Sequence, residues 1–265
     1  MIFLIVMLKK QIIWHLFTEV ISALTMKINR SQLLLLFLLT SVSAQAQEFM
    51  RWNVPVRTLD TPLPHALAGG LNAPQFSTLH LNHDTLPDLF VFDRSGGVPL
   101  LFVQDTLQPS GWTFAPEYAS VFPIMDEWAL IRDFNGDSIP DIFTYSKTGV
   151  PGIDVYRGML LEDSSYSFEP IVFDNAVGVL GYPSSTGDIT NIYVSAIDIP
   201  DINDFDGDGD LDILSFQADG SRIHYYQNIS LEQELDLDSL IYLLEDRCWG
   251  KMVESFNTNE VILSP

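Results

Sequence analysis

The sequence predicts an all-β protein assembled from repeated antiparallel sheets, and three observations lead to that class. No apolar stripe with the period of a helix dominates between Gln47 and Gly220. Short apolar and aromatic runs recur instead, separated by clusters of Gly, Asp, Asn, Ser and Pro, which is typical of strands joined by turns. A loop-and-strand pattern also occurs three times, so we expect repeated units that bury their faces by stacking on neighbours.

Composition narrows the class of partner. The chain has 265 residues, a formal net charge of -22 and 47% hydrophobic residues, which indicates a folded core rather than a disordered acidic tail. The sequence has no basic stripe to meet phosphates, so nucleic acid is excluded as a partner, whereas the acidity suits cation binding. The single cysteine, Cys248, excludes an intramolecular disulfide and a multi-cysteine metal site.

A secretory signal peptide is predicted at residues 26–46. Lys27 and Arg30 form a basic start, an apolar leucine-rich run follows, and Ala44-Gln45-Ala46 has the small-x-small form of a cleavage site. The apolar run is too short for a comfortable membrane span. We therefore expect a secreted or cell-surface protein with no stable membrane span in the mature chain.

The signal peptide divides the chain into three parts. Residues 1–25 precede it and are interpreted as a mis-called extension before a true start at Met26, because a signal peptide should begin near the N-terminus. A membrane anchor in residues 1–24 is the alternative, but charged side chains interrupt its apolar run. Residues 47–265 form the repeat region, which we expect to be truncated.

The repeat is a unit of loop, strand, hairpin turn and strand. Its three copies begin "HLNHDTLPDLFVF" at His80, "DFNGDSIPDIFTY" at Asp133 and "DFDGDGDLDILSF" at Asp204. Each polar loop has nine residues, at 80–88, 133–141 and 204–212, and the following strands are predicted at Leu89–Phe92, Ile142–Tyr145 and Ile213–Phe216. Beyond the third copy, Leu231–Asp246 is predicted either as a helix or as a loop followed by one strand.

Oxygen ligands recur within the second and third loops at positions 1, 3, 5 and 9, and position 7 can offer a backbone carbonyl. These residues are Asp133, Asn135, Asp137, Ile139 and Asp141 in the second loop and Asp204, Asp206, Asp208, Asp210 and Asp212 in the third. A hard cation such as Ca²⁺ takes six to eight oxygens, and the absence of nitrogen and sulfur ligands argues against zinc or copper. The alternative is a solvated acidic turn without an ion. Because two loops carry the same pattern and each precedes a predicted strand of the repeat, a bound ion is favoured.

Two features limit the assignment. An EF-hand needs a bidentate Glu at position 12 and flanking helices, but position 12 is Thr144 or Ser215 inside a predicted strand. The first loop is degenerate, because His80 replaces the first acid while Asn82, Asp84 and Asp88 remain. Since imidazole is a poor partner for Ca²⁺, we interpret His80 as a surface or packing residue.

The pattern D-x-[DN]-x-D-x-x-x-D followed by an apolar strand resembles the FG-GAP/VCBS repeat, the calcium-loop blade of integrin-α-like β-propellers, over roughly Phe76–Asn228. That resemblance implies a four-stranded antiparallel blade per repeat with calcium in a loop between strands. It assigns ligand roles to Asp133, Asn135, Asp137, Asp141, Asp204, Asp206, Asp208 and Asp212. Closed propellers have about four to eight blades, so three units indicate an incomplete or open propeller. Ser138, where the family usually has Gly, is a departure.

No catalytic motif stands out, since G-x-S-x-G, H-E-x-x-H and Gly-rich phosphate loops are absent from the sequence. We therefore expect a non-catalytic, calcium-binding module for protein or glycan binding and adhesion at the cell surface. The alternative is the propeller portion of a calcium-dependent polysaccharide-degrading enzyme. Basic residues are few and do not cluster, which favours the first interpretation.

Overall fold

The structure is a computed structural model, and it describes residues 54–63, 65–82, 84–107, 110–255, 257–258 and 260–263. The predicted signal peptide at 26–46 and the extension at 1–25 lie outside these residues. Among the described helices, none has the length and apolar character needed to cross a membrane.

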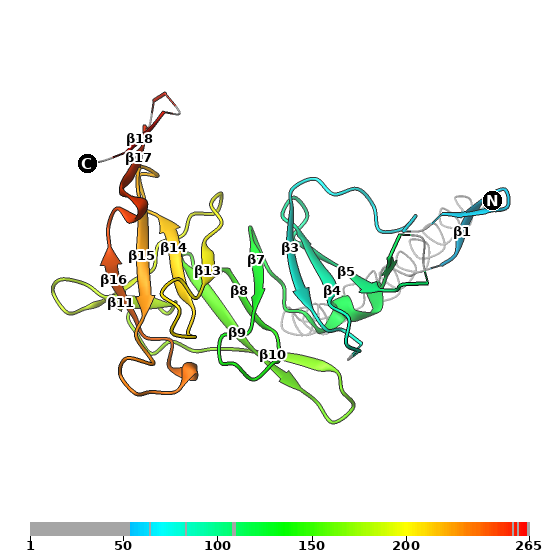
Figure 1. The fold of residues 1–265 in the computed structure, drawn as a ribbon, viewed down its shortest axis with the longest axis horizontal. Helices are drawn as coiled ribbons and strands as arrows, with labels where there is room; N and C mark the ends of the chain where they lie inside the picture. Colours follow the sequence, from blue (N-terminus) through cyan, green and yellow to red (C-terminus); the bar gives the residue numbers. More distant parts are fainter. Residues whose placement is uncertain are drawn as a thin grey trace, which may run out of the picture. The chain divides into compact units, whose positions relative to one another are not determined.

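The described residues form an all-β fold with three four-stranded antiparallel sheets, each with its strands in chain order (Figure 1). The first sheet holds β3 (Pro74–Leu79), β4 (Asp88–Asp93), β5 (Val98–Gln104) and β6 (Trp112–Phe114). The second holds β7 (Ala129–Arg132), β8 (Asp141–Tyr145), β9 (Ile153–Leu160) and β10 (Tyr166–Pro170), and the third holds β13 (Asp201–Asn203), β14 (Asp212–Phe216), β15 (Ile223–Asn228) and β16 (Tyr242–Asp246). None of these described sheets closes into a barrel, so the prediction of an open all-β array is confirmed.

Short elements complete the described chain. Three two-stranded hairpins pair β1 (Val56–Thr58) with β2 (Thr61–Leu63), β11 (Gly181–Pro183) with β12 (Ile189–Asn191), and β17 (Met252–Glu254) with β18 (Val261–Leu263). Three 3₁₀ helices are described as well: η2 (Pro116–Val121), η3 (Leu237–Ser239) and η4 (Trp249–Lys251). The helix predicted over Leu231–Asp246 does not form; the segment is a loop containing η3, followed by β16, which is the alternative that the sequence left open.

Each nine-residue loop occupies the same place, between the first and second strands of its sheet. The last residue of the first strand pairs with the position-9 aspartate, as Leu79↔Asp88, Arg132↔Asp141 and Asn203↔Asp212. The apolar strand predicted after each loop is therefore the second strand of the sheet. The Gly-containing turn then leads into the third strand, and this order confirms the repeat inferred from the sequence.

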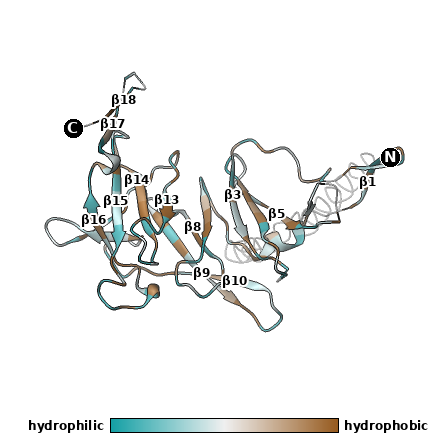
Figure 2. Cartoon of the chain, viewed as in Figure 1, coloured by the Kyte–Doolittle hydropathy of each residue, from teal (hydrophilic) through white to brown (hydrophobic). Residues whose placement is uncertain are grey.

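The sheets pack through their alternating side chains, because successive residues of a strand point to opposite faces. In β8, Ile142 belongs to the apolar cluster shared with the first sheet, while its neighbour Phe143 belongs to the cluster shared with the third. Both side chains are fully buried. Because both faces of β8 and β14 are buried, these strands are rich in apolar residues and are coloured hydrophobic in Figure 2, whereas the less buried β15 carries more polar residues.

Polar contacts also join neighbouring sheets at their first strands. The buried side chains of Gln75 and Ser77 on β3 accept hydrogen bonds from the backbone N–H groups of Ala129 and Ile131 on β7, at 2.9 and 3.1 Å. These acceptors satisfy β7 donors that have no neighbouring strand on that side. The consequence is a fixed offset between the first two sheets, and therefore between their loops.

Candidate metal centre

The position-9 aspartate clamps each loop to its own sheet. Asp88, Asp141 and Asp212 are fully buried. In each, Oδ2 accepts the N–H of the second loop residue, from Leu81, Phe134 and Phe205 at 2.6, 3.0 and 3.0 Å. Oδ1 accepts an N–H from the third strand, from Gln104, Gly158 and Asn228 at 2.8, 2.7 and 2.8 Å. This clamp is present in the first loop as well, so it belongs to the fold of the repeat and does not depend on a ligand at position 1.

Burial raises the pKa of the position-9 aspartates in the second and third loops. The pKa of Asp141 rises to about 7, chiefly because the charged form loses solvent, although the N–H donors of Gly158 and Phe134 act in the opposite direction. The pKa of Asp212 is also raised by burial, against the hydrogen bonds from Asn228, Phe205 and the Tyr225 hydroxyl. Asp141 and Asp212 therefore hold a proton more tightly than ordinary aspartates do.

The position-1 aspartates shape the second and third loops. Asp133 accepts the N–H groups of Gly136 and Ser138, each at 2.8 Å. Asp204 accepts the equivalent N–H groups of Gly207 and Gly209, at 2.6 and 3.1 Å. Since these donors come from residues three and five positions later, the backbone of each loop curls around its position-1 carboxylate.

A second local contact recurs at position 5 in all three loops. Asp84, Asp137 and Asp208 each accept, through Oδ1, the N–H of the residue two positions later, at 2.7, 2.7 and 3.0 Å. In the second loop that donor is Ile139, one of the predicted carbonyl ligands. Such Asx turns use a single carboxylate oxygen, so the other oxygen remains for further partners.

The third loop brings its carboxylates together. Asp204, Asp206 and Asp212, which we call the inner trio, each offer an oxygen such that the three oxygens lie within 4.8 Å of one another. Asp206, Asp208 and Glu232, which we call the outer trio, do the same. These two clusters could hold a metal ion. Glu232 was not predicted, because it lies on the connection between β15 and β16, well outside the nine-residue pattern.

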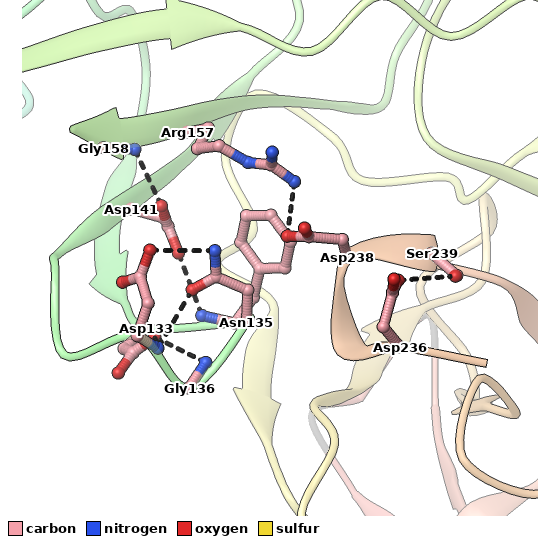
Figure 3. Close-up of polar contacts among 11 residues, drawn as sticks. Asp133, Asn135, Gly136, Asp141, Arg157, Gly158, Asp236, Asp238 and Ser239 are labelled. Atoms are coloured by element: carbon pink, nitrogen blue, oxygen red, sulfur yellow. Dashed lines mark hydrogen bonds and ion pairs between the residues drawn. The ribbon is translucent and has the colours of Figure 1, made fainter. Parts of the chain in front are cut away.

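The second loop is arranged differently (Figure 3). The Nδ2 of Asn135 donates to Asp137 Oδ2 at 3.0 Å, so an amide and a carboxylate pair where the third loop has two acids. Among the described residues, the acidic groups gathered to within 4.8 Å all belong to the two trios. The ligand set proposed for Asp133, Asn135, Asp137 and Asp141 therefore stays a prediction.

The side chain of Asp210 has a feature that the sequence did not suggest. Its backbone carbonyl stays a predicted ligand, and its side chain is fully buried with an Oδ1 that has no hydrogen-bond partner among the described residues. Its Oδ2 lies 3.4 Å from the N–H of Leu231. Burial, followed by the charge of Asp208, raises its pKa to about 7. No signal in the sequence distinguishes this aspartate from its exposed neighbours.

The first loop keeps its form through His80. The Nδ1 of His80 donates across the loop to the carbonyl of Leu86 at 3.0 Å, and its own carbonyl accepts the Tyr166 hydroxyl at 2.6 Å. Because a nitrogen donor occupies the position of the first acid, the loop is braced by hydrogen bonds rather than by converging carboxylates.

The donor chemistry of the third loop is therefore that of oxygen alone: four aspartates and one glutamate gathered in two overlapping trios on a curled loop, with one member fixed in the sheet. Oxygen donors of this kind suit a hard divalent cation. No protein-family model, no curated protein and no solved structure matches the chain.

Proposed function

We propose that the protein is a secreted or cell-surface, calcium-binding repeat module that binds a protein or glycan and has no catalytic role. The observation that carries the calcium part is the inner trio, where three carboxylate oxygens lie within 4.8 Å of one another. Carboxylates at that separation repel one another, and a divalent cation at their centre offsets the repulsion.

The donor set supports calcium over other ions. Asp204 and Asp206 are exposed, so water can complete a coordination sphere of six to eight oxygens around a Ca²⁺ ion. Asp212 would hold the ion to β14, since its carboxylate is already fixed by the N–H groups of Phe205 and Asn228. Bound Ca²⁺ would supply charge neutralisation and stiffening of the loop, and the protein residues would supply its position.

The binding part of the proposal rests on the sequence. The FG-GAP/VCBS-like pattern and the predicted signal peptide both favour an extracellular module, and calcium-stiffened loops on a rigid scaffold are common places for recognition. Fold resemblance alone assigns no ligand. A protein or glycan is favoured as the partner, since the strong negative charge disfavours nucleic acid.

The test is a glycan and extracellular-protein array probed with the purified chain, with calcium and with a chelator. We expect calcium-dependent binding that Asp204→Asn, in the inner trio, weakens and that Asp84→Asn, in the degenerate first loop, leaves unchanged. Cleavage of a polysaccharide by the chain would favour the enzyme alternative instead. A chain that takes up no calcium by calorimetry would overturn the proposal.

A further inference from the structure

The connection between β15 and β16 lies over the third loop and brings an acid to it. Glu232 on this connection shares the outer trio with Asp206 and Asp208. The Nε2 of Gln227, at the end of β15, donates to both Asp206 and Glu232, at 2.7 and 2.6 Å. A neutral amide therefore bridges two carboxylates that come from different loops of the third sheet.

A buried carboxylate lies against the same place. Asp210 is fully buried, and its Oδ1 has no hydrogen-bond partner among the described residues. Its other oxygen faces the N–H of Leu231, the residue before Glu232. Asp210 also follows Asp208 of the outer trio by two residues, so both chain segments that it contacts carry a member of that trio. A buried, unpaired oxygen is costly unless a partner arrives, and a cation is the partner that acidic neighbours would attract.

The charge of the whole cluster favours more than one ion. Asp204, Asp206, Asp208, Asp210, Asp212 and Glu232 together supply six carboxyl groups. One divalent ion at the inner trio would leave most of that charge uncompensated. Among the described residues, the one ion pair within 4.0 Å is Arg157–Asp238, so no basic side chain pairs with the cluster.

We propose that the outer trio, with Asp210, forms a second calcium site that shares Asp206 with the inner site and is completed by Glu232. The second ion would tie the β15–β16 connection to the third loop, because Glu232 is the ligand that comes from that connection. This inference rests on the proposed calcium-binding function, but it concerns a ligand outside the nine-residue repeat.

The experiment is a Ca²⁺ titration of the purified chain by isothermal calorimetry, comparing the parent with Glu232→Gln. Glu234→Gln on the same connection is the matched control, since Glu234 is exposed and belongs to neither trio. Far-UV circular dichroism without calcium checks folding. Asp208→Asn is the second variant, because Asp208 belongs to the outer trio alone.

We expect Glu232→Gln and Asp208→Asn each to bind one ion fewer per chain than the parent, and Glu234→Gln to match the parent. Terbium luminescence sensitised by Tyr225, whose hydroxyl lies 3.0 Å from Asp212 Oδ2, should persist in Glu232→Gln because the inner ion remains. Parent-like stoichiometry and affinity in a folded Glu232→Gln chain would overturn the inference while leaving the proposed function intact. A parent that binds no calcium would overturn both.

Discussion

The second and third loops have the same backbone hydrogen bonds around their position-1 aspartates, but their acidic side chains make different contacts. In the second loop, Asn135 pairs with Asp137 through its amide, and the residues of a neighbouring sheet close over it. In the third loop the corresponding position is Asp206, and the carboxylates gather in two trios instead. The same spacing of acids can therefore produce either a hydrogen-bonded turn or a cluster of carboxylates that could hold a metal ion.

The second loop also differs from the third in being contacted by a segment of another sheet. The β15–β16 connection reaches it from the third sheet: Arg157 pairs with Asp238, and the Arg157 guanidinium lies 5.9 Å from the centroid of the Phe134 ring. Leu237 packs so close to Gly136 that an added Cβ would lie 3.2 Å from Leu237 Cδ1. The connection that carries Glu232 at one end thus covers the second loop at the other (Figure 3).

The largest effect on stability is expected at Gly158, where the second loop touches β9. A Cβ added there would lie 2.1 Å from the carbonyl oxygen of Pro140 and 3.0 Å from Ile139 Cγ2. Backbone cannot move aside cheaply, so Gly158→Ala should lower the free energy of unfolding by about 3 kcal/mol. Gly70→Ala is the matched control, since nothing lies within 4 Å of its added Cβ. Equal urea midpoints for both variants would contradict the close approach.

The next largest effect is a change in the free energy of unfolding with pH, which arises from the titration of Asp141. Burial raises its pKa to about 7 in the folded chain, above the ordinary value of 3.8. The folded state therefore holds this proton more tightly, and the stabilisation is present below about pH 4 and lost as the pH rises through about 7. Asp141→Asn cannot titrate, so the parent should lose stability relative to the variant over that window.

That dependence is measured by urea unfolding with a chelator at several pH values, because bound calcium would compete with the proton. The difference in unfolding free energy between parent and Asp141→Asn is the quantity of interest, since other groups cancel from it. A difference that stays constant between about pH 4 and pH 8 would show that Asp141 titrates as an ordinary aspartate.

A smaller effect separates the two loops through backbone strain. Ser138 has a φ of 66°, in the left-handed region, where the third loop has Gly209 with a φ of 108°. A side chain in that region costs about 1–2 kcal/mol, partly offset by the greater unfolded-state freedom of glycine. Ser138→Gly should therefore stabilise the chain by about 0.5 kcal/mol, and Gly209→Ala should destabilise it by about 1 kcal/mol. Changes of the same sign in both variants would refute the strain argument.

The smallest effect is expected from the ion pair that joins the connection to the second sheet. The side chains of Arg157 and Asp238 are 39% and 43% exposed, so solvent screens their attraction. Asp238→Asn should cost about 0.5 kcal/mol or less in unfolding free energy. Asp236→Asn, two residues earlier, serves as the control, and a loss of several kcal/mol would mean that the pair is far better shielded than its exposure indicates.

Much of the fold followed from the sequence, because its signals are local. The apolar runs after Asp88, Asp141 and Asp212 predicted the second strands, and the Gly-containing turns predicted the third strands. Each of the three larger sheets has four antiparallel strands, as in the blade that the resemblance implies. Leu231–Asp246 remained ambiguous because its apolar residues fit both a helical and an extended period.

The site was less predictable, because side-chain partners lie far apart in the chain. Position 9 was expected to be a ligand, and nothing in the spacing showed that its carboxylate would clamp the loop to a strand that comes 16 or 17 residues later. Glu232 approaches Asp206 through the fold of the third sheet. Asp210 was indistinguishable from exposed aspartates, since burial is a property of packing and not of residue type.

We propose that the third loop binds calcium and does so more tightly than the second. The most direct test of this proposal uses three matched variants at position 5, Asp208→Asn, Asp137→Asn and Asp84→Asn, whose aspartates make the same local turn. Binding to the folded state adds about 2.7 kcal/mol of stability at a hundredfold excess of calcium over Kd. We predict that calcium raises the melting temperature of the parent, and that Asp208→Asn removes more of this rise than Asp137→Asn, with Asp84→Asn unchanged. Equal losses in all three variants, or no thermal shift in the parent, would contradict the claim.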